Sequence, residues 1–163
     1  AVGYTQFERL PGILDRTRAI KKRILSQLDG VPGIEPVRVA DAEGDCGIVL
    51  AIYLPSSDEA QRFSRALAAE GIGNGTIYNK EIPDRHIYKY WDYVMNKWSA
   101  DRTGYPWSPV YYKGHVTYTP DMCQRSLDYL GRVLTISLSQ KWTEEDADDV
   151  VRGIHKVAQA FYG

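Results

Sequence analysis

Residues 48–54 read IVLAIYL and form the longest uninterrupted apolar stretch of the 163-residue chain. β-Branched and aromatic side chains make up much of this stretch, and Pro55 follows at once, as is typical of a β-strand. A strand that is apolar at every position is expected inside a sheet, with both of its faces covered. We therefore place this segment at the centre of the fold and interpret the flanking sequence from it.

Helices and weaker strands are predicted around this central strand. Ser56 and Glu59 have the spacing of a capping box and begin a helix that ends at Gly71. Residues 133–138 read VLTISL and predict another strand, and Thr143 caps a final helix whose first turn is acidic. Together these elements predict an α+β fold, in which a small, mostly antiparallel sheet is packed by helices.

The opening segment is predicted to be helical. Apolar residues recur at three- and four-residue intervals from Leu10 to Leu28, and Gly30 ends the pattern. Pro11 and Gly12 interrupt it, so we expect a kink or a break there, with a short helix before a longer one. Two brief strands are also expected, at residues 37–39 and within residues 72–78.

Composition and charge exclude several classes of protein. Apolar residues make up 44% and the net charge is -1, so no basic field points to nucleic acid or to a membrane surface. The basic run Lys21–Arg23 is interpreted as a solvated helix face. Cys46 and Cys123 lack metal-site spacing, and we expect both to be reduced in a cytoplasmic protein. Because the chain begins at Ala1 within a helix, we also expect that a preceding part was removed.

Residues 79–120 are the least regular part of the sequence and the richest in tyrosine and tryptophan. One helix is expected at about residues 88–98, and the rest reads as a long loop interrupted by prolines. Loops of this length in a domain are usually functional or disordered, and the aromatic content argues against disorder. Two interpretations remain open. The aromatic residues either form a binding site or only pack the loop against itself or against a neighbouring domain.

No catalytic constellation stands out. His86 and His115 lie in the irregular region and are candidates for binding a polar ligand, whereas His155 is expected on the surface of the last helix. The GIGNG stretch at residues 71–75 follows a helix and does not open one, so a turn is favoured over a phosphate-binding loop. The acidic cluster at residues 144–149 is explained by helix capping, and no metal site is predicted.

Three segments, in order, resemble the DegT/StrS family of sugar aminotransferases. They are residues 1–25, residues 67–86 and residues 133–157, so that the resemblance extends over nearly the whole chain. The interval between Tyr78 and His86 is longer than in the family pattern, and Gln140 lies near the place of the usual proline. The positions that match are Ala1, Gly3, Gln6, Leu10, Ile13, Arg16, Leu67, Gly71, Ile72, Tyr78, His86 and Thr143.

The resemblance implies the C-terminal small domain of a fold type I aminotransferase. Such enzymes use pyridoxal phosphate, which forms a Schiff base with a lysine of the large domain, and none of the eight lysines here lies in that lysine motif. The resemblance therefore implies one domain over residues 1–163, with an interdomain helix at 1–30 and an aromatic loop at 79–120. The N-terminal cofactor-binding domain would be absent, and the chain alone would hold neither pyridoxal phosphate nor a catalytic residue.

The resemblance also implies a substrate and partners. The complete enzyme would be a homodimer that aminates a keto-sugar or a keto-sugar acid during sugar or polysaccharide biosynthesis, and this chain would form the substrate-side wall. Tyr78 and His86 are the first candidates for substrate-binding residues, because they lie where the family's small domain borders the active site. Lys80, Trp91 and His115 are further candidates.

A stand-alone binding or interaction domain is the alternative hypothesis. A domain separated from an enzyme would expose an apolar face along the opening helix and the aromatic loop, because a large domain would normally cover it. In a stand-alone domain the same side chains would be covered within the chain.

Overall fold

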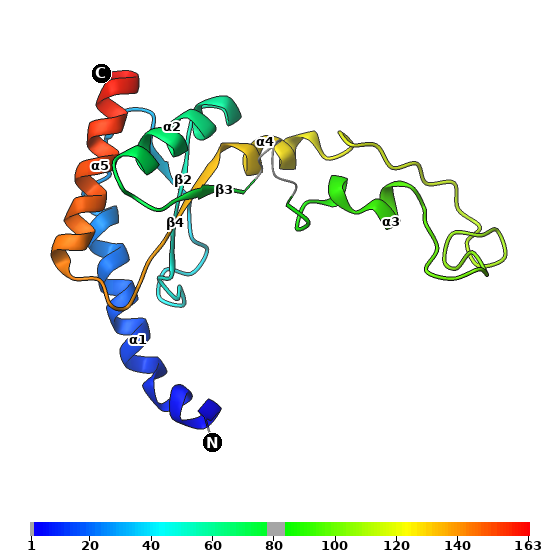
Figure 1. Cartoon of the computed structure of the whole chain (residues 1–163), viewed down its shortest axis with the longest axis horizontal. Helices are drawn as coiled ribbons and strands as arrows, with labels where there is room; N and C mark the ends of the chain where they lie inside the picture. Colours follow the sequence, from blue (N-terminus) through cyan, green and yellow to red (C-terminus); the bar gives the residue numbers. More distant parts are fainter. Residues whose placement is uncertain (1, 78–83) are drawn as a thin grey trace.

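The computed structural model describes residues 2–77 and 84–163, and this part contains one antiparallel sheet in the order β1-β2-β4-β3 (Figure 1). All three neighbouring pairs are antiparallel. The fold is therefore α+β with a small antiparallel sheet, which confirms the predicted class. The strands are β1 (Glu35–Pro36), β2 (Val49–Tyr53), β3 (Gly75–Thr76) and β4 (Val133–Ser137).

The central pair of the sheet is formed by β2 and β4, where the sequence predicted its two best strands. Val49 pairs with Ser137 and Tyr53 pairs with Val133 at the two ends of the ladder. The prediction that β2 is covered on both faces is wrong, because burial alternates along it. Leu50 and Ile52 are buried, whereas Ala51 is only half-buried. Leu50 and Ile52 belong to the main core, whereas on the other face of β2 the Tyr53 ring meets that of Tyr129 at 6.0 Å.

The strand expected at residues 37–39 is also displaced. The ladder with β2 is assigned at Glu35–Pro36, and only the amide of Val37 continues it, by donating to the carbonyl of Ala51 at 2.9 Å. The brief strand expected within residues 72–78 is present as β3. The sequence therefore predicted the positions of these two edge strands only to within about two residues.

The helices of the described residues are, in chain order, α1 (Val2–Leu25), α2 (Ser57–Ala69), a 3-10 turn (Tyr88–Tyr90), α3 (Asp92–Met95), α4 (Gln124–Arg132) and α5 (Glu144–Tyr162). Of the kink or break expected at Pro11, the break is absent, since α1 runs through the proline as one helix. Figure 1 shows the first turns of α1 inclined to the rest of the helix, as a proline inside a helix produces. None of these helices has the length and apolarity needed to cross a bilayer.

The hydrophobic core lies between the sheet and the helices α1, α2 and α5. Ile24 of α1, Phe63 of α2 and Ile154 of α5 are completely buried and meet the inward residues of β2 and β4. Burying one such side chain contributes about 1.5–3 kcal/mol. Both predicted N-caps are present. Ser56 accepts from the amide of Glu59 at 3.2 Å, and Thr143 forms a capping box with Asp146.

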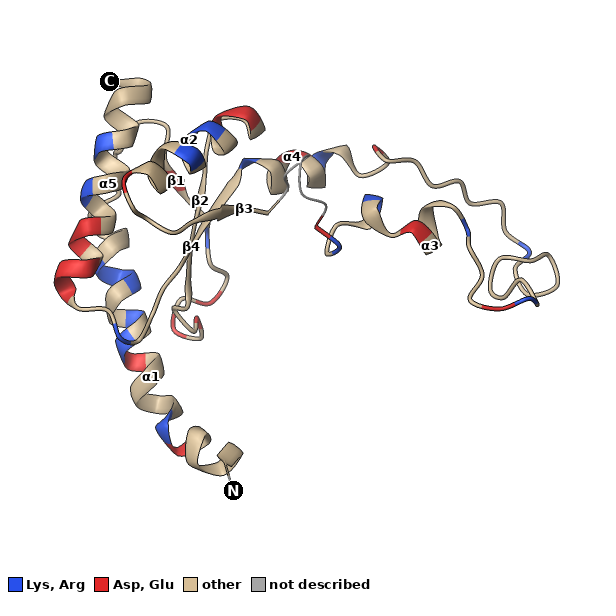
Figure 2. Ribbon diagram, in the orientation of Figure 1, with Lys and Arg blue, Asp and Glu red and all other residues tan. Residues whose placement is uncertain are grey.

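Charged residues join α1 to α5, which lie side by side (Figure 2). The Arg23 guanidinium donates two hydrogen bonds of 2.8 Å to the Asp148 carboxylate and also contacts Glu144 at 2.8 Å. His155, expected on the helix surface, lies 2.8 Å from the carbonyl oxygen of Gln27. The hydrogen bonds from Arg23 lower the pKa of Asp148 to about 2. Within the basic run, Arg23 pairs with α5 and Lys21 with Asp45, so these two residues are not merely solvated.

Acid should weaken this helix contact. Because the pKa of Asp148 is lower in the folded protein than its ordinary value of 3.8, the carboxylate stabilises the fold above about pH 4. This contribution is lost as the pH falls from about 4 through about 2. We expect the urea midpoint of the unsubstituted chain to exceed that of Asp148→Asn near neutral pH and to converge with it in acid. A constant difference between the two midpoints over this range would contradict the pairing.

Candidate functional site

An arm formed by residues 84–122 extends away from the sheet domain (Figure 1). The outgoing and the returning segments of the arm meet at its base. The Tyr88 hydroxyl donates to the carbonyl of Pro120 at 2.9 Å and accepts from the amide of Cys123 at 3.2 Å. Ile87 is buried beside Leu127 of α4. One tyrosine therefore fastens both ends of the arm next to α4.

Aromatic rings pack against each other towards the tip of the arm. The Trp107 ring meets the rings of Tyr112 and Tyr118 edge to face, and Tyr105 meets Tyr111 with ring centroids 5.3 Å apart. Such edge-to-face pairs are favourable because a ring edge is positive and a ring face negative. At the tip, the aromatic residues therefore pack the loop against itself, which is one of the two interpretations that the sequence left open.

The helix expected at about residues 88–98 is mostly absent. The 3-10 turn ends at Trp91, whose φ of -89° and ψ of 84° leave the helical region before the four-residue helix α3 begins. The turn directs the Trp91 indole back, and its Nε1 donates to the carbonyl of Arg85 at 2.5 Å. Lys97, at a φ of 52°, turns the chain again after α3 and donates to the carbonyl of Val116 at 2.5 Å.

These turns enclose a pocket of about 460 Å³ on the arm, which we call the arm pocket. Ligand pockets in proteins typically have about 300–1,000 Å³ and combine aromatic walls with a few polar groups. Trp91, Tyr93 and Trp98 are 45%, 66% and 55% exposed, and Tyr93 and Trp98 meet edge to face at 6.2 Å. The residues that line it are Arg85, Tyr90, Trp91, Asp92, Tyr93, Val94 and Trp98.

The charged groups of the arm pocket are Arg85 and Asp92. Within the part of the chain that the structure describes, neither side chain has an ion pair or a hydrogen bond. The Trp91 indole holds the backbone carbonyl of Arg85, so the backbone that carries the guanidinium is fixed at the pocket wall. A cation and an anion next to exposed aromatic rings can bind the acidic and hydroxyl groups of a polar ligand.

The predicted site residues are placed as follows. Trp91 lines the arm pocket. His86 follows Arg85 in sequence, but its ring Nδ1 lies 2.7 Å from Asp84, and it is not among the lining residues. Its backbone amide and ring lower the pKa of Asp84. His115 is exposed on the returning part of the arm, outside the lining. Tyr78 and Lys80 lie outside the described residues.

Sequence reasoning missed the charged pair and two of the aromatic residues. The sequence predicted no role for Arg85 or Asp92, and it predicted Tyr93 and Trp98 only as part of a helix at about residues 88–98. The signal that was present is the aromatic and charged density of residues 85–98, which contain Arg85, Tyr88, Tyr90, Trp91, Asp92, Tyr93 and Trp98.

The Tyr88 hydroxyl gives a direct test of the arm base. We expect Tyr88→Phe to leave the carbonyl of Pro120 and the amide of Cys123 without this partner, at a cost of about 1 kcal/mol. Amide hydrogen exchange should then speed up by about fivefold in residues 84–122 and remain unchanged in β2 and β4. Equal protection of the arm in both proteins would show that the hydroxyl does not hold its base.

No protein-family model matches the sequence. Solved structures match the fold over nearly the whole chain. The aminotransferase TlmJ from Streptoalloteichus hindustanus is 16% identical, with a TM-score of 0.66 over 99% of this chain and 36% of its own. DesV of S. venezuelae, solved with a ketimine intermediate, is 20% identical, with a TM-score of 0.65 over 97% of this chain and 35% of its own. The sugar aminotransferase Spr1654 from Streptococcus pneumoniae, described as putative, is 19% identical, with a TM-score of 0.60 over 97% and 34%.

These matches define the class of fold. The chain has the α+β fold of the C-terminal third of DegT-type sugar aminotransferases, as the resemblance in sequence predicted. It spans about a third of the length of the solved aminotransferases that it matches. At 16–20% identity the likeness establishes the fold.

Proposed function

We propose that the chain is the C-terminal domain of a pyridoxal-phosphate-dependent aminotransferase that aminates a keto-sugar or a keto-sugar acid. The arm pocket would form part of the substrate-side wall. The observation that carries this proposal is an aromatic pocket whose guanidinium has no partner among the described residues, set on a fold shared with sugar aminotransferases.

The chemistry of the arm pocket suits a sugar. The C–H groups of a sugar ring pack on the faces of Trp91 and Trp98, because those ring faces are negative and the C–H groups slightly positive. Asp92 accepts hydrogen bonds from hydroxyl groups, and Arg85 binds a carboxylate if the sugar carries one. These residues would bind and orient the substrate, and none of them performs a chemical step.

We infer that the cofactor is held outside the residues that the structure describes. Pyridoxal phosphate supplies an electron sink for transamination, and its phosphate is typically bound by free amides at a helix N-terminus. The N-termini of α2 and α5 are instead occupied by their own caps, Ser56 and Thr143. Lys21 is held by Asp45 and Lys156 by Glu70. We therefore assign cofactor binding to a separate large domain.

An exposed apolar face on α1 supports such a partner. Tyr4 and Phe7 are each 70% exposed, and Leu10 lines a hollow of about 250 Å³ on the same helix. Figure 1 shows this half of α1 extending beyond the sheet. Apolar faces of this kind are typical of contacts with another domain. The face favours a domain of an enzyme over the stand-alone alternative, and residues 1–30 would then be the interdomain helix.

The remaining assignments complete the proposal. His86 and His115 would approach the substrate from the arm base and the returning chain, and Tyr78 and Lys80 stay further proposed substrate-binding residues. The complete enzyme would be a homodimer. We infer a cytoplasmic enzyme of sugar or polysaccharide biosynthesis.

The four tryptophans allow a test on the chain as it exists. We expect 5-keto-D-gluconate, a keto-sugar acid, to shift the indole N–H resonances of Trp91 and Trp98 in a saturable manner. Trp142 packs against the core of the sheet domain and serves as the internal control. Pyridoxal phosphate added to the chain should leave no cofactor absorbance band on the protein after gel filtration has removed the unbound cofactor. Unchanged Trp91 and Trp98 resonances would contradict the substrate wall, and a cofactor band would contradict the separate large domain.

A further inference from the structure

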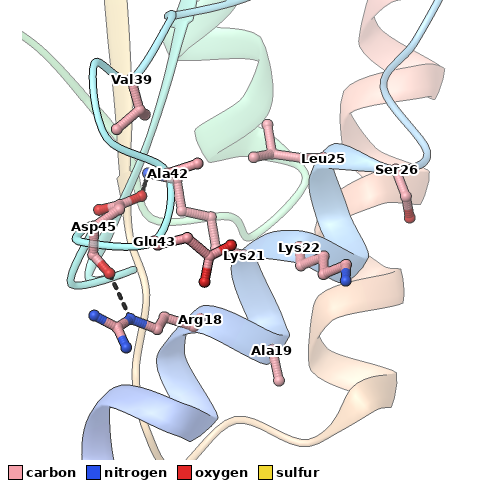
Figure 3. Close-up of a pocket in the computed structure, with 10 residues that line it drawn as sticks. All are labelled: Arg18, Ala19, Lys21, Lys22, Leu25, Ser26, Val39, Ala42, Glu43 and Asp45. Atoms are coloured by element: carbon pink, nitrogen blue, oxygen red, sulfur yellow. Dashed lines mark hydrogen bonds and ion pairs between the residues drawn. The ribbon is translucent and has the colours of Figure 1, made fainter.

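A second pocket, which we call the α1–loop pocket, lies between α1 and the link from β1 to β2 (Figure 3). Its volume is about 650 Å³, within the usual range for small-molecule sites. One wall is a stripe of α1 that includes Lys22 and Leu25, at the helical spacing that places side chains on one face. The opposite wall is the link, with Val39 and Glu43. The substrate-side wall proposed for the arm pocket uses none of these residues.

The link is fastened to α1, so the shape of the pocket is built into the fold. The Thr17 hydroxyl donates to the carbonyl of Cys46 at 2.7 Å, and Arg18 Nε donates to the carbonyl of Asp45 at 2.6 Å. The Lys21 ammonium contacts the Asp45 carboxylate at 2.5 Å and lowers the pKa of that carboxyl. At Gly47, with a φ of 69°, a Cβ atom would lie 2.7 Å from the backbone of α1. Only glycine allows so close an approach at this φ.

Two opposite charges line the α1–loop pocket without a partner. In Figure 3 the Glu43 carboxylate reaches from the link towards α1, and the Lys22 side chain extends along α1 with its ammonium directed away from the link. Both residues are exposed, and neither side chain has an ion pair or a hydrogen bond with any residue that the structure describes. The charges of Lys21 and Asp45 cancel each other in the wall. Among the described residues, the pocket therefore offers the Lys22 ammonium and the Glu43 carboxylate without a partner, beside the Arg18 guanidinium that donates to the carbonyl of Asp45.

Apolar side chains line the space next to these charges. Leu25 and Ala19 belong to α1, and Val39 and Ala42 to the link. Val39 is 39% exposed, although an apolar side chain of its size is usually buried. A ligand for this pocket thus needs an apolar body and two opposite charges.

We propose that the α1–loop pocket binds a zwitterionic α-amino acid with an apolar side chain. Lys22 binds the carboxylate, Glu43 binds the ammonium group, and the side chain covers Val39 and Leu25. A ligand with only one charge would leave Lys22 or Glu43 facing an apolar group, which lowers its affinity. The site lies on the sheet domain and is separate from the arm pocket in both its residues and its ligand.

Isothermal titration calorimetry on the 163-residue chain tests this proposal with three matched probes. L-leucine carries both charges, 4-methylpentanoate carries only the carboxylate, and 3-methylbutylamine carries only the ammonium group. We expect saturable binding of L-leucine and affinities about three- to tenfold lower for the other two, as loss of one solvent-screened charge contact implies. Absence of L-leucine binding, or equal binding of all three probes, would overturn the proposal.

Substitutions then locate the binding to the pocket. Lys22→Gln and Glu43→Gln should each weaken L-leucine binding about three- to tenfold, and each should remove the preference for one of the two charged groups. Because neither side chain has a structural partner, circular dichroism should show both variants folded. Arg65→Gln, at an exposed position of α2, is the matched control and should bind as the unsubstituted chain does. Unaltered binding by both pocket variants would place the ligand elsewhere and overturn the assignment.

Discussion

Phe63→Ala should lower the free energy of unfolding by about 3–5 kcal/mol, which is a large part of the stability of a domain of this size. Phe63 is completely buried, and its ring meets that of Phe161 edge to face at 5.6 Å. Truncation removes the buried apolar surface and leaves a cavity between α2 and α5 that rigid neighbours fill only in part. Urea unfolding followed by circular dichroism measures the difference.

The same substitution at an exposed phenylalanine is the control. Phe7 is 70% exposed on α1, so Phe7→Ala should change the free energy of unfolding by less than about 0.5 kcal/mol. Similar losses of stability in both variants would mean that Phe7 is covered in solution, which favours the stand-alone domain.

Arg85→Gln should weaken binding of 5-keto-D-gluconate to the arm pocket about three- to tenfold. The guanidinium has no ion pair within the described residues, so a carboxylate can take both of its donors. The expected loss of affinity is modest because Arg85 is exposed and solvent screens its charge. The shifts of the Trp91 and Trp98 indole resonances give the affinity.

A neutral sugar and a distant arginine separate charge recognition from other effects. D-Fructose lacks the carboxylate, and its affinity should be the same with arginine or glutamine at position 85. Arg102→Gln, at an exposed position in the arm tip, should leave both affinities unchanged. An equal loss of affinity for 5-keto-D-gluconate and for D-fructose would show that Arg85 shapes the pocket and does not recognise the carboxylate.

Local patterns predicted the sheet domain well. The apolar run at 48–54, the strand at 133–138 and the caps Ser56 and Thr143 each depend on residues close in sequence, and all four are present. The alternating burial of β2 was not predictable in the same way, because it depends on where distant helices pack. Val49 and Ala51 are apolar but face away from the main core.

Long-range contacts explain what the sequence did not predict. The arm pocket depends on a turn at Trp91 and on an arm base closed between Tyr88 and Pro120, 32 residues apart. The partners of Lys21 and Arg23 lie 24 and 125 residues away, so the run itself looks like a solvated face. Residue type indicated an aromatic site, and only the fold showed which aromatic and charged residues share one pocket.

The most direct test of the proposed enzyme uses the polypeptide isolated from its natural source. An antibody raised against this chain captures it. Borohydride reduction fixes pyridoxal phosphate covalently on its lysine, and peptide mass spectrometry then locates that lysine. We expect the cofactor on a lysine outside residues 1–163, in the same polypeptide or in one that purifies with it. A modified lysine within residues 1–163, or a purified protein that contains no pyridoxal phosphate at all, would contradict the proposal.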